Sequence, residues 1–439
     1  MMKARQAAFL VLERCRKDGA WASAAVDTII RDNLTDKREA ALASAIAFGT
    51  LQNLSYFDYL ISCFCTTKID KLEGRVLTIL RIGVCQLALL DRIPERAAVN
   101  ETVALCDLFD LGRAKSLVNA VLRRIAAQHG EFPEVPGEGS AEYLAVRYSH
   151  PLWFAEQMIS EKGYAFAEAF FKANRDVCGL DIQVNTLRVT AEEFRRMLDR
   201  KEISYHIPPF PNDCFSLDGG AVEHLPGYEE GLFYVQDRAA REAVKVAGIQ
   251  PGARILDACA CPGGKSFAAA IDMKGRGSIL ACDIHEKKLS LVHSGANRLG
   301  IDILQTACLD ARSFIPSYRE AFDTVIADVP CSGLGVIRKK PEIRQKRRED
   351  ISGLPTVQRN ILENLSRYVR PGGILLYSTC TVLHEENEDV ISSFLEQHHE
   401  FSPCDFSVGE RKSSGGCYTF WPHIDGTDGF FVSKLVKEA

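Results

Sequence analysis

The sequence predicts a multidomain protein with an all-helical N-terminal domain, a small α+β module and a C-terminal α/β domain built on a mainly parallel sheet. Three observations predict this fold class: helical spacing of apolar residues through about residue 128, a segment rich in Pro, Gly and acid at residues 130–140, and a regular alternation of short apolar runs with helical spacers after residue 236. A chain of 439 residues can form two or three hydrophobic cores.

The first predicted domain, residues 1–130, is all-helical. Apolar residues recur at helical spacing through residues 7–11, 40–48 and 76–90, with few β-branched clusters. Residues 117–124 place an apolar helical face beside two arginines. This pattern favours a helix C-terminus whose dipole attracts cations, and an RNA-facing edge is the alternative.

The middle of the chain contains a linker followed by a mixture of helical and strand patterns. Residues 130–140 concentrate linker residues, so we expect a domain boundary there. Between residues 141 and 230, helix-like stretches at 152–173 and 191–200 alternate with short strand candidates, of which the first is 181–185. A small α+β module over residues 141–230 fits this pattern.

The last predicted domain, residues 231–439, has alternating strands and helices. It begins with a strand candidate at 231–235 and a helix candidate at 238–247. The expected strands of the main sheet follow at 254–259, 278–283, 303–309, 322–327 and 373–378. Such alternation specifies a mainly parallel sheet covered on both faces. Ligands bind such sheets outside the carboxyl ends of the strands.

The bulk composition limits the class of protein. With 46% hydrophobic and 25% charged residues, and no apolar run of ~18 residues, the chain is expected to be cytoplasmic with no membrane association. Fifteen cysteines occur without any C-x-x-C pair, which indicates reduced thiols and no metal site.

A net charge of −5 does not by itself indicate a nucleic-acid-binding protein. The basic residues nevertheless gather locally, because residues 338–340 and 344–348 form a dense positive stretch. This stretch is either a solvated surface run or an RNA-binding face. It follows shortly after the loop at residues 328–335, described below as a candidate active-site loop, and this position makes both interpretations reasonable.

The strand that ends at Asp257 is followed by a loop suited to a nucleoside. Gly263 and Gly264 follow a proline and allow the backbone to approach a ligand, and the helix that begins there offers free N–H groups. The spacing matches neither a dinucleotide fingerprint nor a phosphate loop. Asp283 ends the next strand, where a carboxylate can accept hydrogen bonds from both ribose hydroxyls, and Asp310 follows the third, where it can hold an adenine amino group.

Two cysteines follow the fourth and fifth strands. Asp328 and Cys331 lie in one loop, and Cys380 lies in the neighbouring one. Since carboxyl ends of parallel strands meet at one edge of a sheet, the two thiols can converge on one substrate. Chain position alone leaves both cysteines as candidate nucleophiles.

Residues 257–266, 328–335 and 378–380 resemble motifs of the Nop2/Sun family of RNA cytosine-C5 methyltransferases. Residues 93–101, 118–124 and 426–431 are more particularly similar to bacterial members that act on 16S ribosomal RNA and join a NusB-like helical RNA-binding domain to the catalytic domain. The resemblance spans nearly the whole chain. It implies that residues 1–130 are NusB-like and that residues 231–439 form a Rossmann-like class I methyltransferase domain.

The resemblance also implies roles for site residues. Cytosine C5 is a poor nucleophile, so a thiolate first adds to C6. The cysteine matching Cys380 is the family's nucleophile, the one matching Cys331 assists product release, Asp328 would bind the cytosine edge, and Lys265 would position the base. The methyl donor S-adenosylmethionine would be held by Cys259, Ala260, Cys261, Pro262, Gly263, Gly264, Lys265, Asp283, Asp310 and Asp328.

Two alternatives remain open. The chain could be a NusB-like RNA-binding protein with an idle methyltransferase scaffold, although intact Lys265, Asp328 and both cysteines speak against this. Cys331 could instead be the nucleophile, because its Pro-Cys context resembles that of DNA cytosine-C5 methyltransferases.

His384 could remove the C5 proton, although a capping or surface role is favoured. The expected partner is 16S ribosomal RNA, free or in an assembling small subunit, and the expected oligomeric state is a monomer.

Overall fold

The structure is a computed structural model that describes residues 2–175, 179–211, 213–218 and 222–439. Its contacts divide the chain into two compact units. The helical unit comprises Met1–Asp176 with Ile337–Arg348, and the sheet unit comprises Val177–Val336 with Glu349–Ala439. The boundaries predicted near residues 130, 141 and 231 remain predictions.

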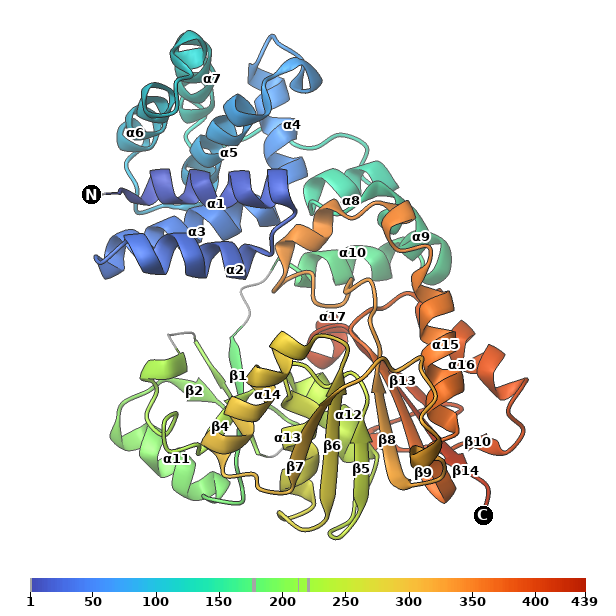
Figure 1. The fold of residues 1–439 in the computed structure, drawn as a ribbon. Coiled ribbons are helices and arrows are strands. Elements are labelled where there is room, and N and C mark those ends of the chain that lie inside the picture. The colour runs from blue at the N-terminus through green and yellow to red at the C-terminus, as the bar shows by residue number, and fades with distance from the viewer. Residues whose placement is uncertain (1, 176–178, 212, 219–221) are drawn as a thin grey trace. The chain divides into compact units, whose positions relative to one another are not determined.

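The helical unit confirms the all-helical N-terminal fold (Figure 1). Helices α1 to α7 share one apolar core that includes Phe9, Phe57 and Ile79. At Gly83 a Cβ atom would lie 2.5 Å from the side chain of Leu122, so glycine allows α5 and α7 to approach closely. The helices are α1 (Ala4–Asp18), α2 (Ala22–Val26), α3 (Lys37–Gln52), α4 (Leu54–Phe64), α5 (Gly74–Leu89), α6 (Glu95–Leu108), α7 (Lys115–Ala126), α8 (Ala141–Arg147), α9 (Leu152–Lys162) and α10 (Tyr164–Ala173).

A distant segment completes the helical unit. Residues 337–348 include the short turn η6 (Pro341–Gln345), and Arg344 is buried within it. Its guanidinium donates hydrogen bonds to the carbonyl oxygens of Tyr148, Ser149 and Asn174, at 2.8, 3.1 and 2.9 Å. These carbonyls close α8 and α10, whose negative dipole ends favour a cation. Arg344 is therefore a structural residue, which corrects the interpretation of 344–348 as a wholly solvated or RNA-facing run.

A small antiparallel sheet begins the sheet unit. The strand order is β2 (Tyr205–His206), β3 (Cys214–Leu217), β1 (Leu180–Val184), β4 (Phe233–Val235). Helix α11 (Ala191–Arg200) packs on this sheet through Phe194, which contacts Phe215 and Phe233 with ring centroids 5.5 and 5.7 Å apart. Helix α11 begins at a capping box formed by Thr190 and Glu193.

The larger sheet carries the predicted parallel strands. Its order is β10-β14-β9-β8-β5-β6-β7, and β5 to β9 pair in parallel. Helices α12 to α14 pack in one apolar core and α15 and α16 in a second, so both faces are covered (Figure 1). The elements are β5 (Arg254–Asp257), β6 (Ser278–Asp283), β7 (Leu304–Cys308), β8 (Phe322–Asp328), β9 (Val369–Thr379), α12 (Arg238–Val246), α13 (Gly264–Asp272), α14 (Glu286–Leu299), α15 (Leu354–Ser366) and α16 (Glu388–Leu395).

Antiparallel strands at the C-terminal end were not predicted. Strand β14 (Phe430–Lys437) pairs with β9, with Phe431 opposite Thr379, and it also pairs with β10 (Phe401–Pro403) and β13 (Cys417–Phe420). This pairing brings the C-terminal segment to the end of β9. The remaining short elements are β11 (Ser407–Val408), β12 (Arg411–Lys412) and α17 (Pro422–Asp425).

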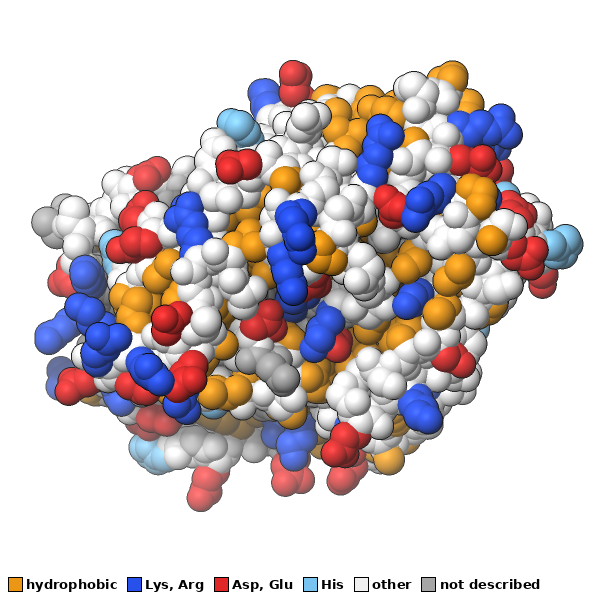
Figure 2. Space-filling model, turned by 90° about the horizontal axis from the view of Figure 1, so that it is seen from below, with side chains coloured by type: hydrophobic (Ala, Val, Ile, Leu, Met, Phe, Trp, Pro, Cys, Tyr) orange, Lys and Arg blue, Asp and Glu red, His pale blue; other side chains and the backbone are white. Residues whose placement is uncertain are grey.

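Two surface observations bear on partners. On the face shown in Figure 2, acidic and basic side chains are interspersed with scattered hydrophobic ones, and neither sign of charge dominates. Among the helices that the structure describes, none combines the length and the apolar character needed to cross a bilayer.

Candidate active site

The carboxyl ends of β5, β8 and β9 gather the predicted catalytic residues. The Nζ atom of Lys265, in the first turn of α13, lies 2.6 Å from Oδ2 of Asp328 at the end of β8. Ser378 on β9 donates a hydrogen bond of 2.8 Å to the other carboxylate oxygen of Asp328. The contact between Ser378 and Asp328 follows from the sheet register, because the two residues are partners across the parallel pair β8–β9.

The two predicted cysteines converge. The Sγ atoms of Cys331 and Cys380 are 3.1 Å apart, and the backbone N–H of Cys380 points at the sulfur of Cys331 with an N···S distance of 3.3 Å. Both residues are half-buried. The hydrogen bond with Cys380 and then burial raise the pKa of the Cys331 thiol well above its usual value. This arrangement favours a protonated Cys331 that can donate its S–H to the sulfur of Cys380.

The loop between β5 and α13 has the backbone expected of a close ligand approach. Gly263 has φ of +114°, and a Cβ atom there would lie 2.5 Å from the ring of Phe267. Ser266 donates a 2.7 Å hydrogen bond to Asp257, which is fully buried at the end of β5. Burial raises the pKa of the Asp257 carboxyl to about 6.

Asp283 and Asp310 occupy the expected strand ends with different partners. Asp283 accepts hydrogen bonds from the backbone N–H groups of His285 (2.9 Å) and Cys261 (3.4 Å), so its carboxylate lies beside the glycine loop. Asp310 forms an ion pair with Arg312 at 2.6 Å. The carboxylate of Asp310 is therefore already bound by a cation, and Asp310 lines a small pocket with Ala258 and Cys282.

These residues fit an adenosyl donor. The half-buried carboxylate of Asp283 can accept hydrogen bonds from a pair of hydroxyls, and it is held against the loop that Gly263 bends. The loop leads into the N-terminus of α13, which offers unpaired N–H groups. Cys259, Ala260, Pro262 and Gly264 lie in or beside the same loop, and burial raises the pKa of the neighbouring Cys261 thiol to about 12, so that thiol stays neutral.

The sequence did not point to several residues that line the site. The Nζ atom of Lys265 lies 5.0 Å from the ring centroid of Phe430, which β14 brings in. Glu386 and Asn387 are fully buried behind the cysteines. They lie in the acidic run 385–389, which in sequence is typical of a solvated surface. His384 pairs with Asp389 at 2.9 Å and is exposed, as the favoured surface role requires.

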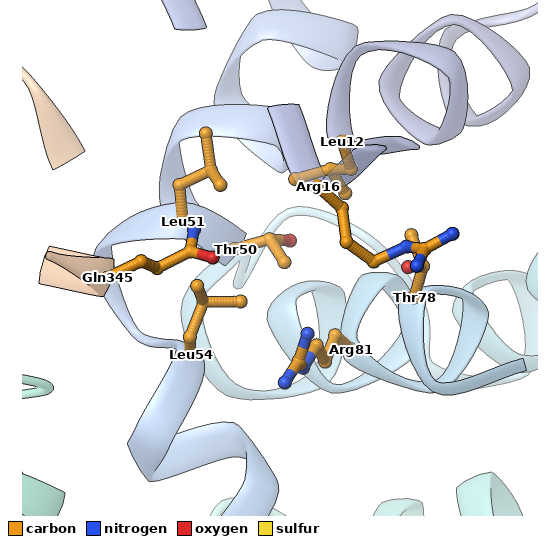
Figure 3. Close-up of a pocket in the computed structure, with 8 residues that line it drawn as sticks. All are labelled: Leu12, Arg16, Thr50, Leu51, Leu54, Thr78, Arg81 and Gln345. Carbon is orange, nitrogen blue, oxygen red and sulfur yellow. The ribbon is translucent and has the colours of Figure 1, made fainter. Parts of the chain in front are cut away.

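A second, small pocket lies in the helical unit. Figure 3 shows Arg16 and Arg81 on one side of it, with Gln345 of the segment 337–348 on another. Arg16 pairs with Glu13 and Arg81 with Asp58, each at 2.6 Å. Because both guanidinium groups already have carboxylate partners, this pocket does not form a free anion site.

The described part of the chain contains no cluster of three or more His, Cys, Asp or Glu side chains that could hold a metal ion. The chemistry available at this site is that of two thiols, a Lys–Asp pair and a nucleoside-binding loop. A thiol pair can supply a nucleophile that adds to an electron-poor ring, so this combination suits group transfer.

Comparisons with known proteins show the family of the chain. Residues 245–436 match the family model described as 16S rRNA methyltransferase RsmB/F, and residues 2–127 match the NusB family. A probable ribosomal RNA small subunit methyltransferase B of Bacillus subtilis (strain 168) is 30% identical over 99% of this chain and 98% of its own length. The ribosomal RNA small subunit methyltransferase B of Yersinia pseudotuberculosis serotype O:1b is 31% identical over 93% of each chain.

Solved structures show the same fold. The crystal structure of PH0851 aligns with 100% of this chain and 99% of its own, with a TM-score of 0.83 and 25% identity. The structure of NSun6 from Pyrococcus horikoshii with SFG aligns with 65% of this chain and 97% of its own, with a TM-score of 0.60 and 20% identity.

Proposed function

Because the chain belongs to the RsmB/F family of rRNA methyltransferases, we propose that it transfers a methyl group from S-adenosylmethionine to C5 of a cytosine in 16S ribosomal RNA. The reaction proceeds through a covalent adduct between Cys380 and cytosine C6. The NusB-like helical region binds the RNA, and the enzyme acts in the cytoplasm on free RNA or on an assembling small subunit. The observation that carries the proposal is the pair of sulfur atoms 3.1 Å apart beside the Lys265–Asp328 ion pair.

The first step needs a thiolate. The sulfur of Cys380 adds to C6 and forms an S–C6 bond, which makes C5 nucleophilic. The S–H of Cys331 can stabilise the Cys380 thiolate by a hydrogen bond, since the two sulfurs lie 3.1 Å apart and the pKa of Cys331 is raised. This contact offers a source for the activation of Cys380.

The base must be held while the adduct forms. Asp328 is fixed by Lys265 and Ser378, so one carboxylate can accept hydrogen bonds from the amino edge of cytosine while Lys265 polarises the ring. S-adenosylmethionine, when bound, supplies an electrophilic methyl group at a sulfonium. Cys259 to Lys265, Asp283 and Asp328 are the residues proposed to hold it, and Asp310 remains a proposed ligand only if its pair with Arg312 opens.

The adduct must then be resolved. A base takes the proton from C5, the C–H electron pair restores the C5–C6 double bond, and the C6–S bond breaks to return the Cys380 thiolate. Cys331, beside the breaking bond, assists this release. The raised pKa of Cys331, which favours its protonated form beside Cys380, supports this division of roles.

The test uses Cys380→Ala and Cys331→Ala with 16S RNA and labelled donor. Cys380→Ala should form neither adduct nor 5-methylcytosine, whereas Cys331→Ala should accumulate an RNA adduct that survives denaturing electrophoresis. Cys63→Ala, an exposed cysteine of the helical unit, is the matched control. The reverse pattern would make Cys331 the nucleophile, and RNA binding without any transfer by the wild type would favour the idle-scaffold alternative.

A further inference from the structure

A fully buried polar network lies behind the two cysteines. Glu386 and Asn387 are neighbours in the turn after β9. Glu386, together with Gln358, contacts the residues on both sides of Cys331, and Asn387 contacts those on both sides of Cys380. The buried side chains of this network are each 0% exposed: Ser332, Gln358, Thr379, Thr381, Glu386 and Asn387. Buried polar groups are costly unless they are hydrogen-bonded, so their contacts define the local geometry.

Glu386 brackets Cys331. Its Oε2 atom accepts a 2.8 Å hydrogen bond from the backbone N–H of Ser332, the residue after Cys331. The same oxygen accepts a 2.8 Å hydrogen bond from Nε2 of Gln358 on α15. Gln358 Nε2 also donates to the carbonyl oxygen of Pro330, the residue before Cys331, at 3.0 Å. The peptide groups on both sides of Cys331 are therefore held by one carboxylate and its amide partner.

Asn387 brackets Cys380 in the same way. Its Oδ1 atom accepts a 2.6 Å hydrogen bond from Thr379, the residue before Cys380, and its Nδ2 donates to the carbonyl oxygen of Thr381, the residue after it, at 3.2 Å. Asn387 occupies the N-cap position of α16, yet its side chain makes no capping hydrogen bond there. Asn at an N-cap usually accepts a hydrogen bond from its own helix, whereas this side chain forms its hydrogen bonds with the cysteine loop.

The two brackets are joined. The hydroxyl groups of Ser332 and Thr381 are 2.7 Å apart, which links the residue after Cys331 to the residue after Cys380. Tyr377 also donates a 2.6 Å hydrogen bond to the backbone carbonyl of Glu386, which fixes the turn. The dipeptide Glu386-Asn387, together with Gln358, thus holds the residues that flank both cysteines.

We propose that Glu386 is the positioning residue for Cys331 and Asn387 the positioning residue for Cys380, so that the first controls resolution of the covalent adduct and the second controls its formation. This inference rests on the proposed function. The charge of Glu386 is a further, smaller cause of the raised pKa of Cys331, after the hydrogen bond with Cys380 and burial. Glu386 therefore also helps to keep Cys331 protonated while Cys380 is the thiolate.

The test measures adduct formation and adduct decay in single turnovers of the full chain with 16S RNA and donor. Glu386→Ala should slow decay about tenfold and accumulate adduct, whereas Asn387→Ala should slow formation about tenfold and leave less adduct. This factor lies within the range expected for the two buried hydrogen bonds that each substitution removes. Glu386→Gln keeps an acceptor but removes the charge, so its decay rate should show a pH profile moved to lower pH. Glu385→Gln, the half-buried neighbour in the same turn, is the matched control.

Two more conservative variants remove single hydrogen-bond donors and keep the test valid if the alanine variants misfold. Gln358→Met removes the amide donor of the first bracket, and Thr379→Val removes the hydroxyl donor of the second. Gln358→Met should slow adduct decay and Thr379→Val should slow adduct formation. The melting temperature and the affinity for S-adenosylhomocysteine should be nearly unchanged in both. Equal loss of both steps in all four variants would overturn the inference. Absence of any adduct in Cys331→Ala and of any transfer by the wild type would instead overturn the proposed function.

Discussion

Replacement of Arg344 by Met tests the idea that a segment following the Cys331 loop completes the helical unit. Arg344 donates to the carbonyl oxygens of Tyr148, Ser149 and Asn174 at the ends of α8 and α10. Met fills a similar volume but leaves the carbonyl oxygens of Ser149 and Asn174 without a donor, and that of Tyr148 with only Nδ1 of His150, at 2.8 Å. At about 1–3 kcal/mol for each unsatisfied group, offset by relief of a buried cation, the expected loss is about 3–5 kcal/mol.

That loss is a large fraction of ordinary domain stability, about 5–15 kcal/mol. Burial lowers the pKa of Arg344 to about 9, so the cation is present at neutral pH although its desolvation is costly. Urea unfolding of a Trp421→Phe background follows the helical unit alone, because the other two tryptophans, Trp21 and Trp153, lie there. With a slope of about 2 kcal/mol per molar urea, the midpoint should fall by about 2 M.

Two further variants refine this prediction. Arg344→Lys should lose less than Arg344→Met, because an ammonium keeps the charge but cannot reach both helix ends with a planar fork. The exposed neighbour Arg347→Met should stay within about 0.5 kcal/mol of the wild type. A midpoint for Arg344→Met that equals that of Arg347→Met would refute the assigned role of the buried guanidinium.

Three other predictions concern the sheet unit. Burial raises the pKa of Asp257 from 3.8 to about 6, so the folded state binds this proton more tightly, and ionisation of the group should cost up to about 3 kcal/mol of stability as the pH rises from 4 to 7. The free energy of unfolding of Asp257→Asn should therefore increase relative to that of the wild type as the pH rises. A difference between the two in urea unfolding that does not change with pH would contradict this. A Cβ atom on Gly335 would lie 1.9 Å from the carbonyl oxygen of Gly429, so Gly335→Ala should lower the melting temperature and abolish transfer, whereas Gly353→Ala, with open space around it, should do neither. Lys265→Met leaves Asp328 without its cation and should reduce kcat/KM about 100-fold, with donor affinity in titration calorimetry changed only a few-fold.

Much of the fold was predictable because it depends on local periodicity. The range predicted for α11 matches the structure, and the strand that ends at Asp283 was predicted with both ends correct. Strand-end placement of Asp257, Asp328 and Cys380 followed from the alternation of strands and helices. The antiparallel strands β10, β13 and β14 were missed, since they are joined by irregular segments and lack the helical spacers that mark parallel strands.

The candidate site was predictable where chemistry-bearing side chains occupy loops after strands. Cys331 contacts Cys380, and Lys265 contacts Asp328. Asp310 remains a predicted donor ligand, and its carboxylate is paired with Arg312, two residues away. Glu386 and Asn387 could not be found, because an acidic run in sequence is usually solvent-exposed.

The sequence by itself determined the alternation of the parallel strands with helices, the residues at the ends of those strands and the resemblance to a methyltransferase family. Only the tertiary structure decided that Arg344 is buried against two helix ends, that Phe430 lies beside Lys265, and that Glu386 and Asn387 hold the cysteine loops. The physical reason is that periodicity and turn chemistry act over a few residues, whereas these contacts join residues from 6 to 196 positions apart in the chain. Burial of a charged or polar side chain is a property of what folds over it, and no local pattern encodes that.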